Sequence, residues 1–266
     1  MGRVAGVNDQ LLDPFRSSPE DSGLFLDFDG TLSEIVLIPS DARPAEGARE
    51  LLADLAARLR LVAIVSGRAA GQLLEWLGPE VEIWGIHGAE RTREGRVELS
   101  DRAEPYAELM ERVRNEAERR VDELGIPGLL VEDKRVMVGL HYRTAPDVEA
   151  AGRALGEIVE ELAQGYGLLS ATGRMAFELR PPIEFSKAQV VLQRTREASL
   201  KAAGFVGDDR VDLPAFDALD SLSEEGVATL RVGVDSKEAP PELRERSDVL
   251  VQGPQGVLEF LNQLLN

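Results

Sequence analysis

The residues from Leu24 to Leu32, LFLDFDGTL, constrain the fold of this chain more than any other stretch. An apolar run of strand length ends in Asp27 and Asp29, and Gly30 follows. Ligands bind where the strands of open parallel sheets end, so we predict a buried strand that delivers two carboxylates to a crevice. Two close carboxylates repel each other and need a cation or a shared proton, and a hard divalent ion is the simplest source of that charge.

The composition favours a soluble, cytoplasmic protein. The 266 residues suffice for one large domain or two smaller ones, and the absence of cysteine excludes disulfides and thiolate metal sites. The N-terminus shows no signal-peptide pattern, and no apolar run approaches the roughly 20 residues of a membrane span. A formal charge of −18, from 48 acidic and 30 basic residues, disfavours nucleic acid and anionic membranes as partners. We expect a monomer, although the sequence leaves the oligomeric state open.

Strands and helices alternate at both ends of the chain. Apolar runs at 61–65 and 81–84 follow the first strand, and helical spacing of apolar residues predicts helices from Pro44 to 59 and over 69–77. The alternation resumes with helices over 186–203, 212–222 and 256–265 and with strands before Asp208 and at 229–234 and 249–250. This order is typical of a doubly wound, Rossmann-like parallel α/β sheet.

The middle of the chain has a different order of elements. We predict helices over 106–124 and 146–163, each followed by two strands, at 129–132 and 136–142 and at 168–171 and 175–179. The sequence thus predicts a smaller α/β domain over 105–181, inserted into a core made of 21–104 and 182–266. Residues 1–20 are polar without a sustained period, and we expect a loosely held lead-in.

Charged and polar residues stand at strand ends or helix starts that the sequence predicts for the core. They are Asp27 and Asp29, Ser66, Lys187, and Asp208 with Asp209. The ends of parallel strands meet at one edge of a sheet, so these residues can converge. A carboxylate nucleophile, a second carboxylate for proton transfer, a lysine and a hydroxyl for anionic oxygens, and acids for Mg²⁺ together fit phosphoryl transfer through an aspartyl-phosphate.

The same residues resemble the four motifs of the haloacid dehalogenase (HAD) superfamily of phosphatases. The matching segments are Asp27-Phe28-Asp29-Gly30-Thr31-Leu32, Ser66-Gly67-Arg68, Lys187 and Gly207-Asp208-Asp209. Further segments resemble the trehalose-6-phosphate phosphatases, whose cap lies between the second and third motifs: Gly85-Ile86-His87-Gly88-Ala89-Glu90, Glu132-Asp133-Lys134, His141-Tyr142-Arg143 and Glu178-Leu179-Arg180-Pro181. Two places depart from the pattern. Ala188 follows Lys187 where the family usually has glycine, and the last motif reads Asp208-Asp209-Arg210-Val211-Asp212-Leu213 where a threonine and an acid are common.

The resemblance implies a role for each motif residue. Asp27 would attack phosphorus, and Asp29 would protonate the leaving sugar oxygen and then activate water. Ser66 and Lys187 would hold phosphate oxygens. The Mg²⁺ ligands would be Asp27, Asp208 and the carbonyl of Asp29, with Asp209 ligating or just outside. The residues expected to contact the sugar phosphate are Arg68, His87, Glu132, Lys134 and Glu178.

Each of these residues also has a purely structural interpretation. Asp27 and Asp29 can be local acceptors in a turn, and the Asp208-Asp209 pair and Ser66 can cap helices. Lys187 can be an exposed lysine of a first helical turn, although a cation there is unfavourable without an anion nearby. The charged residues of the insert can pair on a solvated strand face, and Arg68 can bind phosphate or pair with a core acid.

We therefore expect a Mg²⁺-dependent phosphatase that converts trehalose 6-phosphate to trehalose and phosphate. The alternatives are a phosphatase for another glycosyl phosphate, of the sucrose, glucosylglycerol or mannosylglycerate type, and a non-catalytic sugar-phosphate-binding protein. A phosphomutase is a further alternative, and it would have to retain the phosphoenzyme while the sugar reorients.

Overall fold

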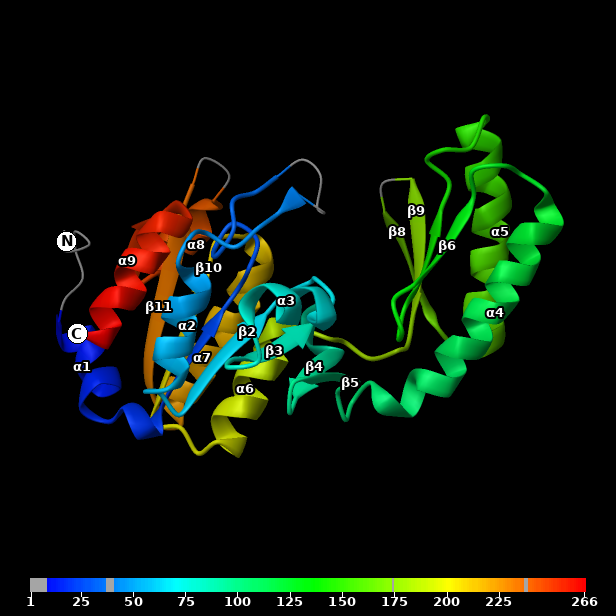
Figure 1. Ribbon diagram of the computed structural model, residues 1–266. Helices are drawn as coiled ribbons and strands as arrows, with labels where there is room; N and C mark the ends of the chain where they lie inside the picture. Colours follow the sequence, from blue (N-terminus) through cyan, green and yellow to red (C-terminus); the bar gives the residue numbers. More distant parts are fainter. Residues whose placement is uncertain (1–8, 37–40, 174, 237–238) are drawn as a thin grey trace. The chain divides into compact units, whose positions relative to one another are not determined.

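The computed structural model describes residues 9–36, 41–173, 175–236 and 239–266. The chain divides into two compact units, which we call the core unit and the cap unit (Figure 1). The core unit comprises residues up to Glu98 and from Phe185 onwards, and the cap unit comprises Leu99–Glu184. The predicted insert at 105–181 falls inside the cap unit.

The core unit contains a mixed sheet in the strand order β12-β11-β10-β1-β2-β3-β4-β5. The parallel strands are β1 (Ser22–Leu26), β2 (Leu61–Val65), β3 (Glu82–Gly85), β10 (Ala202–Gly207), β11 (Ala228–Asp235) and β12 (Val249–Gln252). Two further strands, β4 (Glu90–Arg93) and β5 (Arg96–Leu99), extend one edge, and β4 runs antiparallel to β3. Because β1 and β10 lie side by side, the segments that follow them emerge at the same sheet edge.

Helices cover both faces of this sheet, as predicted for a doubly wound fold (Figure 1). Leu24 and Leu26 of β1 pack in the cluster on one face, and Phe25 packs in the cluster on the other. The first face is covered by α1 (Asp9–Ser17), α2 (Ala48–Ala56), α3 (Ala70–Leu77) and α9 (Gly253–Leu265). The second face is covered by α6 (Lys187–Glu197), α7 (Leu213–Glu224) and α8 (Pro241–Arg246). Strands buried on both faces explain the continuous apolar runs of the sequence.

Several sequence predictions for the core unit are wrong. The helix predicted over 186–203 ends at Glu197 as α6, and Ala202 and Ala203 already belong to β10. The lead-in contains α1, whose Leu12 and Phe15 are buried in the core, so residues 9–17 are not loosely held; residues 1–8 lie outside the described residues. Helix α2 begins at Ala48 after a left-handed Gly47, four residues beyond Pro44. The hairpin strands β4 and β5 were not predicted, because their charged residues give no apolar run.

The cap unit contains an antiparallel sheet in the order β6-β7-β9-β8, with α4 (Ala107–Leu124) and α5 (Val148–Tyr166) packed on one face (Figure 1). Its strands are β6 (Leu130–Asp133), β7 (Val138–His141), β8 (Leu169–Gly173) and β9 (Ala176–Arg180). Both predicted strand pairs are present. Val138 and Leu140 point toward the helices, so the alternate residues Gly139 and His141 lie on the opposite face.

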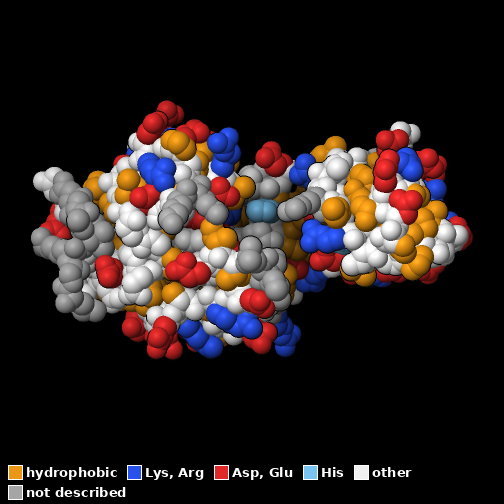
Figure 2. All heavy atoms as spheres, turned by 90° about the horizontal axis from the view of Figure 1, so that it is seen from above, with side chains coloured by type: hydrophobic (Ala, Val, Ile, Leu, Met, Phe, Trp, Pro, Cys, Tyr) orange, Lys and Arg blue, Asp and Glu red, His pale blue; other side chains and the backbone are white. Residues whose placement is uncertain are grey.

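Charged side chains of both signs share the molecular surface. On the face that Figure 2 shows, acidic and basic side chains are interspersed on each unit. Among the described residues, no helix combines the length and the apolar character that crossing a membrane requires.

Candidate active site

The carboxyl ends of two adjacent parallel strands bring Asp27 and Asp208 together. Leu26, the last residue of β1, is in register with Val206 of β10, and the Asp27 amide donates a 2.9 Å hydrogen bond to the Val206 carbonyl. Asp27 directly follows β1, and Asp208 directly follows β10. The predicted convergence of these two motifs is therefore correct.

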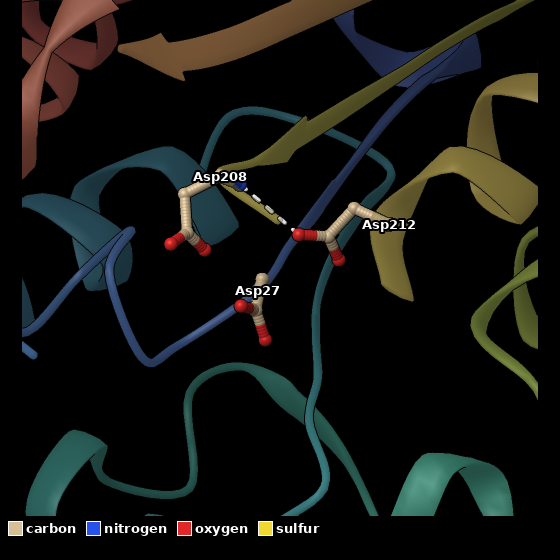
Figure 3. Close-up of side chains that lie close together, drawn as sticks. All are labelled: Asp27, Asp208 and Asp212. Atoms are coloured by element: carbon tan, nitrogen blue, oxygen red, sulfur yellow. Dashed lines mark hydrogen bonds between the residues drawn. The ribbon is translucent and has the colours of Figure 1, made fainter. Parts of the chain in front are cut away.

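A third carboxylate, Asp212, joins these two in a buried cluster (Figure 3). One carboxylate oxygen from each of Asp27, Asp208 and Asp212 lies within 4.8 Å of the others. Asp212 ends the short 3₁₀ helix η5 (Arg210–Asp212), and its Oδ2 accepts the backbone N–H groups of Asp208 at 3.0 Å and Asp209 at 3.1 Å. Asp212 thus fixes the backbone that presents Asp208.

The Lys187 ammonium lies inside this acidic cluster. Its Nζ is 2.6 Å from Asp27 Oδ1 and 2.7 Å from Asp212 Oδ1, and the residue is only 2% exposed. The interpretation of Lys187 as an exposed helix residue is therefore wrong. Burial lowers the pKa of Lys187, but the charges of Asp27 and Asp212 outweigh burial, so the net pKa is raised. The ammonium stays protonated and partly compensates its carboxylate neighbours.

One ammonium does not balance three buried carboxylates. Burial raises the pKa of Asp27 to about 7 against the opposing attraction of Lys187, and burial with the charges of Asp27 and Asp212 raises the pKa of Asp208 to about 8. The two oxygens of Asp212 already accept hydrogen bonds, so Asp27 and Asp208 are the members best able to bind a cation. Carboxylate oxygens suit a hard divalent ion, so the donor set fits the metal that the sequence predicted.

Gly30 allows the first motif to fold back against Asp208. Its φ is +79°, and a Cβ at this position would lie 1.9 Å from Asp208 Oδ2, so any side chain would collide with that carboxylate. Thr31, the next residue, places its Oγ1 3.5 Å from Asp208 Oδ1. Gly30 is therefore needed for two reasons: its positive φ allows the chain to bend, and its lack of a side chain allows the backbone to pack against Asp208.

Asp29 lies outside the three-carboxylate cluster and pairs with Arg68. The Arg68 side chain donates from Nε to Asp29 Oδ2 at 2.8 Å and from its terminal nitrogen Nη2 to Asp29 Oδ1 at 2.7 Å. The alternative in which Arg68 pairs with a core acid is therefore correct. The expectation that the Asp27 and Asp29 carboxylates share one cation is wrong for Asp29, because its carboxylate pairs with Arg68. The expected metal role of its backbone carbonyl stays a prediction.

Ser66 and His87 lie in two loops that contact each other. Ser66 is buried at the end of β2, and its Oγ accepts the Arg68 N–H at 3.2 Å. The His87 amide donates to the Ser66 carbonyl at 2.8 Å, and the imidazole packs so closely on Gly67 that a Cβ there would lie 2.9 Å from the ring. Ile86 and His87 both have positive φ, 48° and 55°, in the 3₁₀ turn η3 (Ile86–Gly88). Their roles toward substrate stay predictions.

Asp209 is a helix cap in this structure. Its Oδ1 accepts the Arg210 N–H at 2.6 Å at the start of η5, and its side chain is not part of the carboxylate cluster. Among the described acidic residues, the cluster contains Asp212, which the sequence analysis did not name, and does not contain Asp209. The capping interpretation of the Asp208-Asp209 pair is correct for Asp209 and wrong for Asp208, whose carboxylate belongs to the cluster.

The polar residues predicted in the cap form a charged group on the sheet face opposite α4 and α5. Lys134 Nζ donates to Glu178 Oε1 at 2.6 Å and lies 3.7 Å from Glu132 Oε2. His141 Nε2 is 2.8 Å from the same Glu132 oxygen. We call these residues the cap quartet: Glu132, Lys134, His141 and Glu178. Gly139, opposite both glutamates in the sheet, leaves space between them, because a Cβ there would meet His141 at 3.0 Å and Glu132 at 3.2 Å.

A cavity of about 430 Å³ opens beside the Asp29–Arg68 pair. It is lined by Asp29, Ile35, Val36, Gly67, Arg68 and Gln72. Carboxylate, guanidinium and amide groups beside two aliphatic side chains are suited to a polar ligand that also presents carbon–hydrogen surface.

The fold of this chain is that of the HAD-like α/β proteins. The structure resembles a haloacid dehalogenase-like hydrolase from Bacteroides thetaiotaomicron over 91% of this chain and 98% of the other, with a TM-score of 0.55 and 14% identity. It also resembles the C-terminal domain of trehalose-6-phosphate phosphatase from C. albicans over 98% of both chains, with a TM-score of 0.65 and 23% identity. At these identities the comparisons establish the fold.

Within this class, the chain belongs to the trehalose-phosphatase family. The family model, trehalose-phosphatase, matches residues 25–247. Trehalose-phosphate phosphatases from Mycobacterium avium and Mycobacterium leprae are 38% and 34% identical over 78% and 91% of this chain. The chain covers 54% and 57% of those two relatives, so it spans about half their length.

The raised pKa values predict how the metal-free protein responds to pH. Asp27 and Asp208 bind protons up to about pH 7 and 8 when folded, but only near pH 3.8 when unfolded. The free energy of unfolding must therefore fall as pH rises from 4 to 8. In EDTA we expect the melting temperature to decrease from pH 5 to pH 8, by about 2–4 °C for each kcal/mol of unfolding free energy that is lost. We expect Mg²⁺ to raise the melting temperature more at pH 8 than at pH 5. An equal Mg²⁺ effect at both pH values would contradict this expectation, and Asp208→Asn should flatten the dependence.

Proposed function

We propose that this chain hydrolyses trehalose 6-phosphate to trehalose and phosphate through an aspartyl-phosphate. The observation that carries the proposal is the buried cluster in which Lys187 and two further acids surround Asp27, a constellation suited to a carboxylate nucleophile. Family membership supports the substrate, because the family is described by its action on trehalose phosphate. We propose cytoplasmic action on this small molecule, without nucleic acid or membrane as partner.

Asp27 is the proposed nucleophile. Its oxygen forms a bond to phosphorus while the bond between phosphorus and the sugar oxygen breaks. Lys187, 2.6 Å from Asp27 Oδ1, favours the carboxylate form of the nucleophile. Ser66 and the Lys187 charge are proposed to stabilise the phosphoryl oxygens.

Asp29 is the proposed acid and base. It gives a proton to the departing sugar oxygen, and in the second step it takes a proton from the water that attacks the aspartyl-phosphate. That attack breaks the bond between phosphorus and the Asp27 oxygen, so phosphate leaves and the enzyme is regenerated.

Mg²⁺ is the proposed cofactor, and Asp27 and Asp208 would hold it with the Asp29 carbonyl. When bound, the ion neutralises negative charge on the transferring phosphoryl group. Asp212 is proposed to support this site indirectly, through the Asp208 amide and Lys187.

Phosphate release from trehalose 6-phosphate with Mg²⁺, and its loss with EDTA, tests the proposal. We expect turnover that excess Mg²⁺ restores after chelation. A panel of sucrose 6-phosphate, glucosylglycerol phosphate and mannosylglycerate phosphate, compared by kcat/KM, tests the substrate. A higher kcat/KM for another sugar phosphate would make that compound the proposed substrate in place of trehalose 6-phosphate. Measurable binding without phosphate release would indicate a non-catalytic binding protein.

Variants of the cap quartet test whether the cap unit recognises the sugar of the substrate. Glu132, Lys134 and Glu178 are proposed to bind sugar hydroxyls, and His87 is proposed to contact substrate from the core unit. Glu178→Gln should raise KM for trehalose 6-phosphate while p-nitrophenyl phosphate, which lacks the sugar, is hydrolysed as before. Arg114→Ala, which breaks the cap ion pair with Asp133, is the matched control and should change neither substrate.

A further inference from the structure

The Asp29 carboxylate is held by a single guanidinium through both of its oxygens. Bidentate pairing of this kind fixes the plane as well as the position of a carboxylate. The Arg68 side chain is 12% exposed, whereas the Asp29 side chain is 41% exposed. Arg68 is therefore the anchored partner, and Asp29 is the partner that solvent and ligand can reach.

Aromatic rings hold the Arg68 guanidinium in place. Its central carbon lies 5.6 Å from the ring centre of Phe28 and 5.4 Å from that of Trp76, and these two rings stack on each other at 5.4 Å. The remaining terminal nitrogen, Nη1, donates to Gln72 Oε1 at 3.2 Å. Each of the three guanidinium nitrogens thus already donates to Asp29 or Gln72.

We propose that Arg68 is a positioning residue that acts through Asp29, and that it does not serve as a ligand of the substrate phosphate. This inference rests on the proposed function, in which Asp29 transfers a proton to the leaving oxygen. A proton donor must lie within hydrogen-bond reach of the oxygen that it protonates. Arg68 keeps Asp29 at the wall of the 430 Å³ cavity that both residues line.

Leaving-group dependence separates this role from phosphate binding. The kcat/KM of a phosphatase of this kind reports the steps up to departure of the alcohol. p-Nitrophenol leaves without protonation, whereas the sugar alcohol requires it. We expect Arg68→Met to lower kcat/KM for trehalose 6-phosphate by about 10–100-fold, within the range of a general-acid contribution, and to lower kcat/KM for p-nitrophenyl phosphate by less than about threefold.

A double-mutant cycle with Asp29→Asn tests the coupling. Asp29→Asn should show the same preference for the good leaving group, and Arg68→Met should cause no further loss in its presence. Arg43→Met is the control variant: Arg43 also lies over Trp76, at 5.4 Å, but its terminal nitrogen donates to the Ala42 carbonyl. We expect Arg43→Met to leave the ratio of the two kcat/KM values unchanged.

Equal losses on both substrates would overturn the proposal, because they would indicate that Arg68 binds the phosphoryl group. Additive losses in the double variant would overturn it too. If Asp29→Asn itself shows no leaving-group dependence, the proposed acid role of Asp29 fails and this inference fails with it, whereas a failure of Arg68 alone leaves that role intact. Should Arg68→Met not fold, Arg68→Lys retains the charge without the bidentate geometry, and the same pattern is expected in it.

Discussion

Asp27→Asn is expected to abolish turnover, with kcat for trehalose 6-phosphate lower by about 10³-fold or more, because an amide cannot form the aspartyl-phosphate. The substitution keeps the shape of the side chain. It also removes a charge that burial disfavours, since the pKa of Asp27 is raised to about 7. We therefore expect the metal-free variant at pH 8 to melt no lower than the wild type.

The measurement combines steady-state phosphate release with thermal unfolding in EDTA. The control is Asp54→Asn, at an exposed position of α2, and it should change neither quantity. Substantial turnover by a folded Asp27→Asn variant would show that another group attacks phosphorus. Loss of folding would show that Asp27 also serves to compensate Lys187, so the two measurements are needed together.

The parallel sheet could be predicted from the sequence because its strands are buried on both faces. β1 and β2 read as uninterrupted apolar runs, and each ends in polar residues at the edge where ligands bind. Strands β4 and β5 extend the sheet as a charged hairpin, in which Arg and Glu side chains leave no apolar run. The hydrophobic pattern therefore reveals strands of the sheet interior better than strands at its edge.

Asp212 could not be placed from its motif alone. The sequence segment 208–213 contains three aspartates, of which Asp208 was expected as a ligand and Asp209 as a ligand or a residue just outside, whereas Asp212 was given no role. The 3₁₀ turn η5 instead points Asp209 at the Arg210 amide and brings Asp212 back to the Asp208 amide. Gly207 makes room for this return, since a Cβ there would lie 2.5 Å from the Asp212 carboxyl carbon. The only hint in the sequence was that Asp212 stands four residues after Asp208 and that Gly207 directly precedes Asp208.

The pairing of Arg68 was also open in the sequence, because a guanidinium serves phosphate and carboxylate equally well. Only tertiary structure shows that Phe28 and Trp76, nearly 50 residues apart, form the surface on which it lies. The burial of Lys187 was not predicted, but a cation at a helix N-terminus is unfavourable without an anion nearby, and this argument favoured a functional role over an exposed position.

Lys187→Met is expected to be among the most destabilising single substitutions in the core unit. It fills the same volume but leaves Asp27 and Asp212 without the ammonium that lies 2.6 and 2.7 Å from them. Removing one partner of a buried ion pair costs about 3–5 kcal/mol, because an uncompensated charge stays in the interior. At pH 8 we expect the melting temperature to fall by roughly 10 °C and phosphate release to be lost.

The pH dependence of this loss identifies its cause. Asp27, whose pKa burial already raises to about 7, can escape its unpaired charge by binding a proton, so Lys187→Met should be markedly less destabilised at pH 5 than at pH 8. Lys201→Met removes an exposed lysine that pairs with Asp21, and as a surface substitution it should change stability by less than about 0.5 kcal/mol at either pH. An equal destabilisation of Lys187→Met at both pH values would mean that the side chain acts through packing, and the electrostatic account of the cluster would have to be abandoned. If Asp27→Asn or Asp212→Asn restores the stability of Lys187→Met at pH 8, the ammonium is compensating that particular carboxylate.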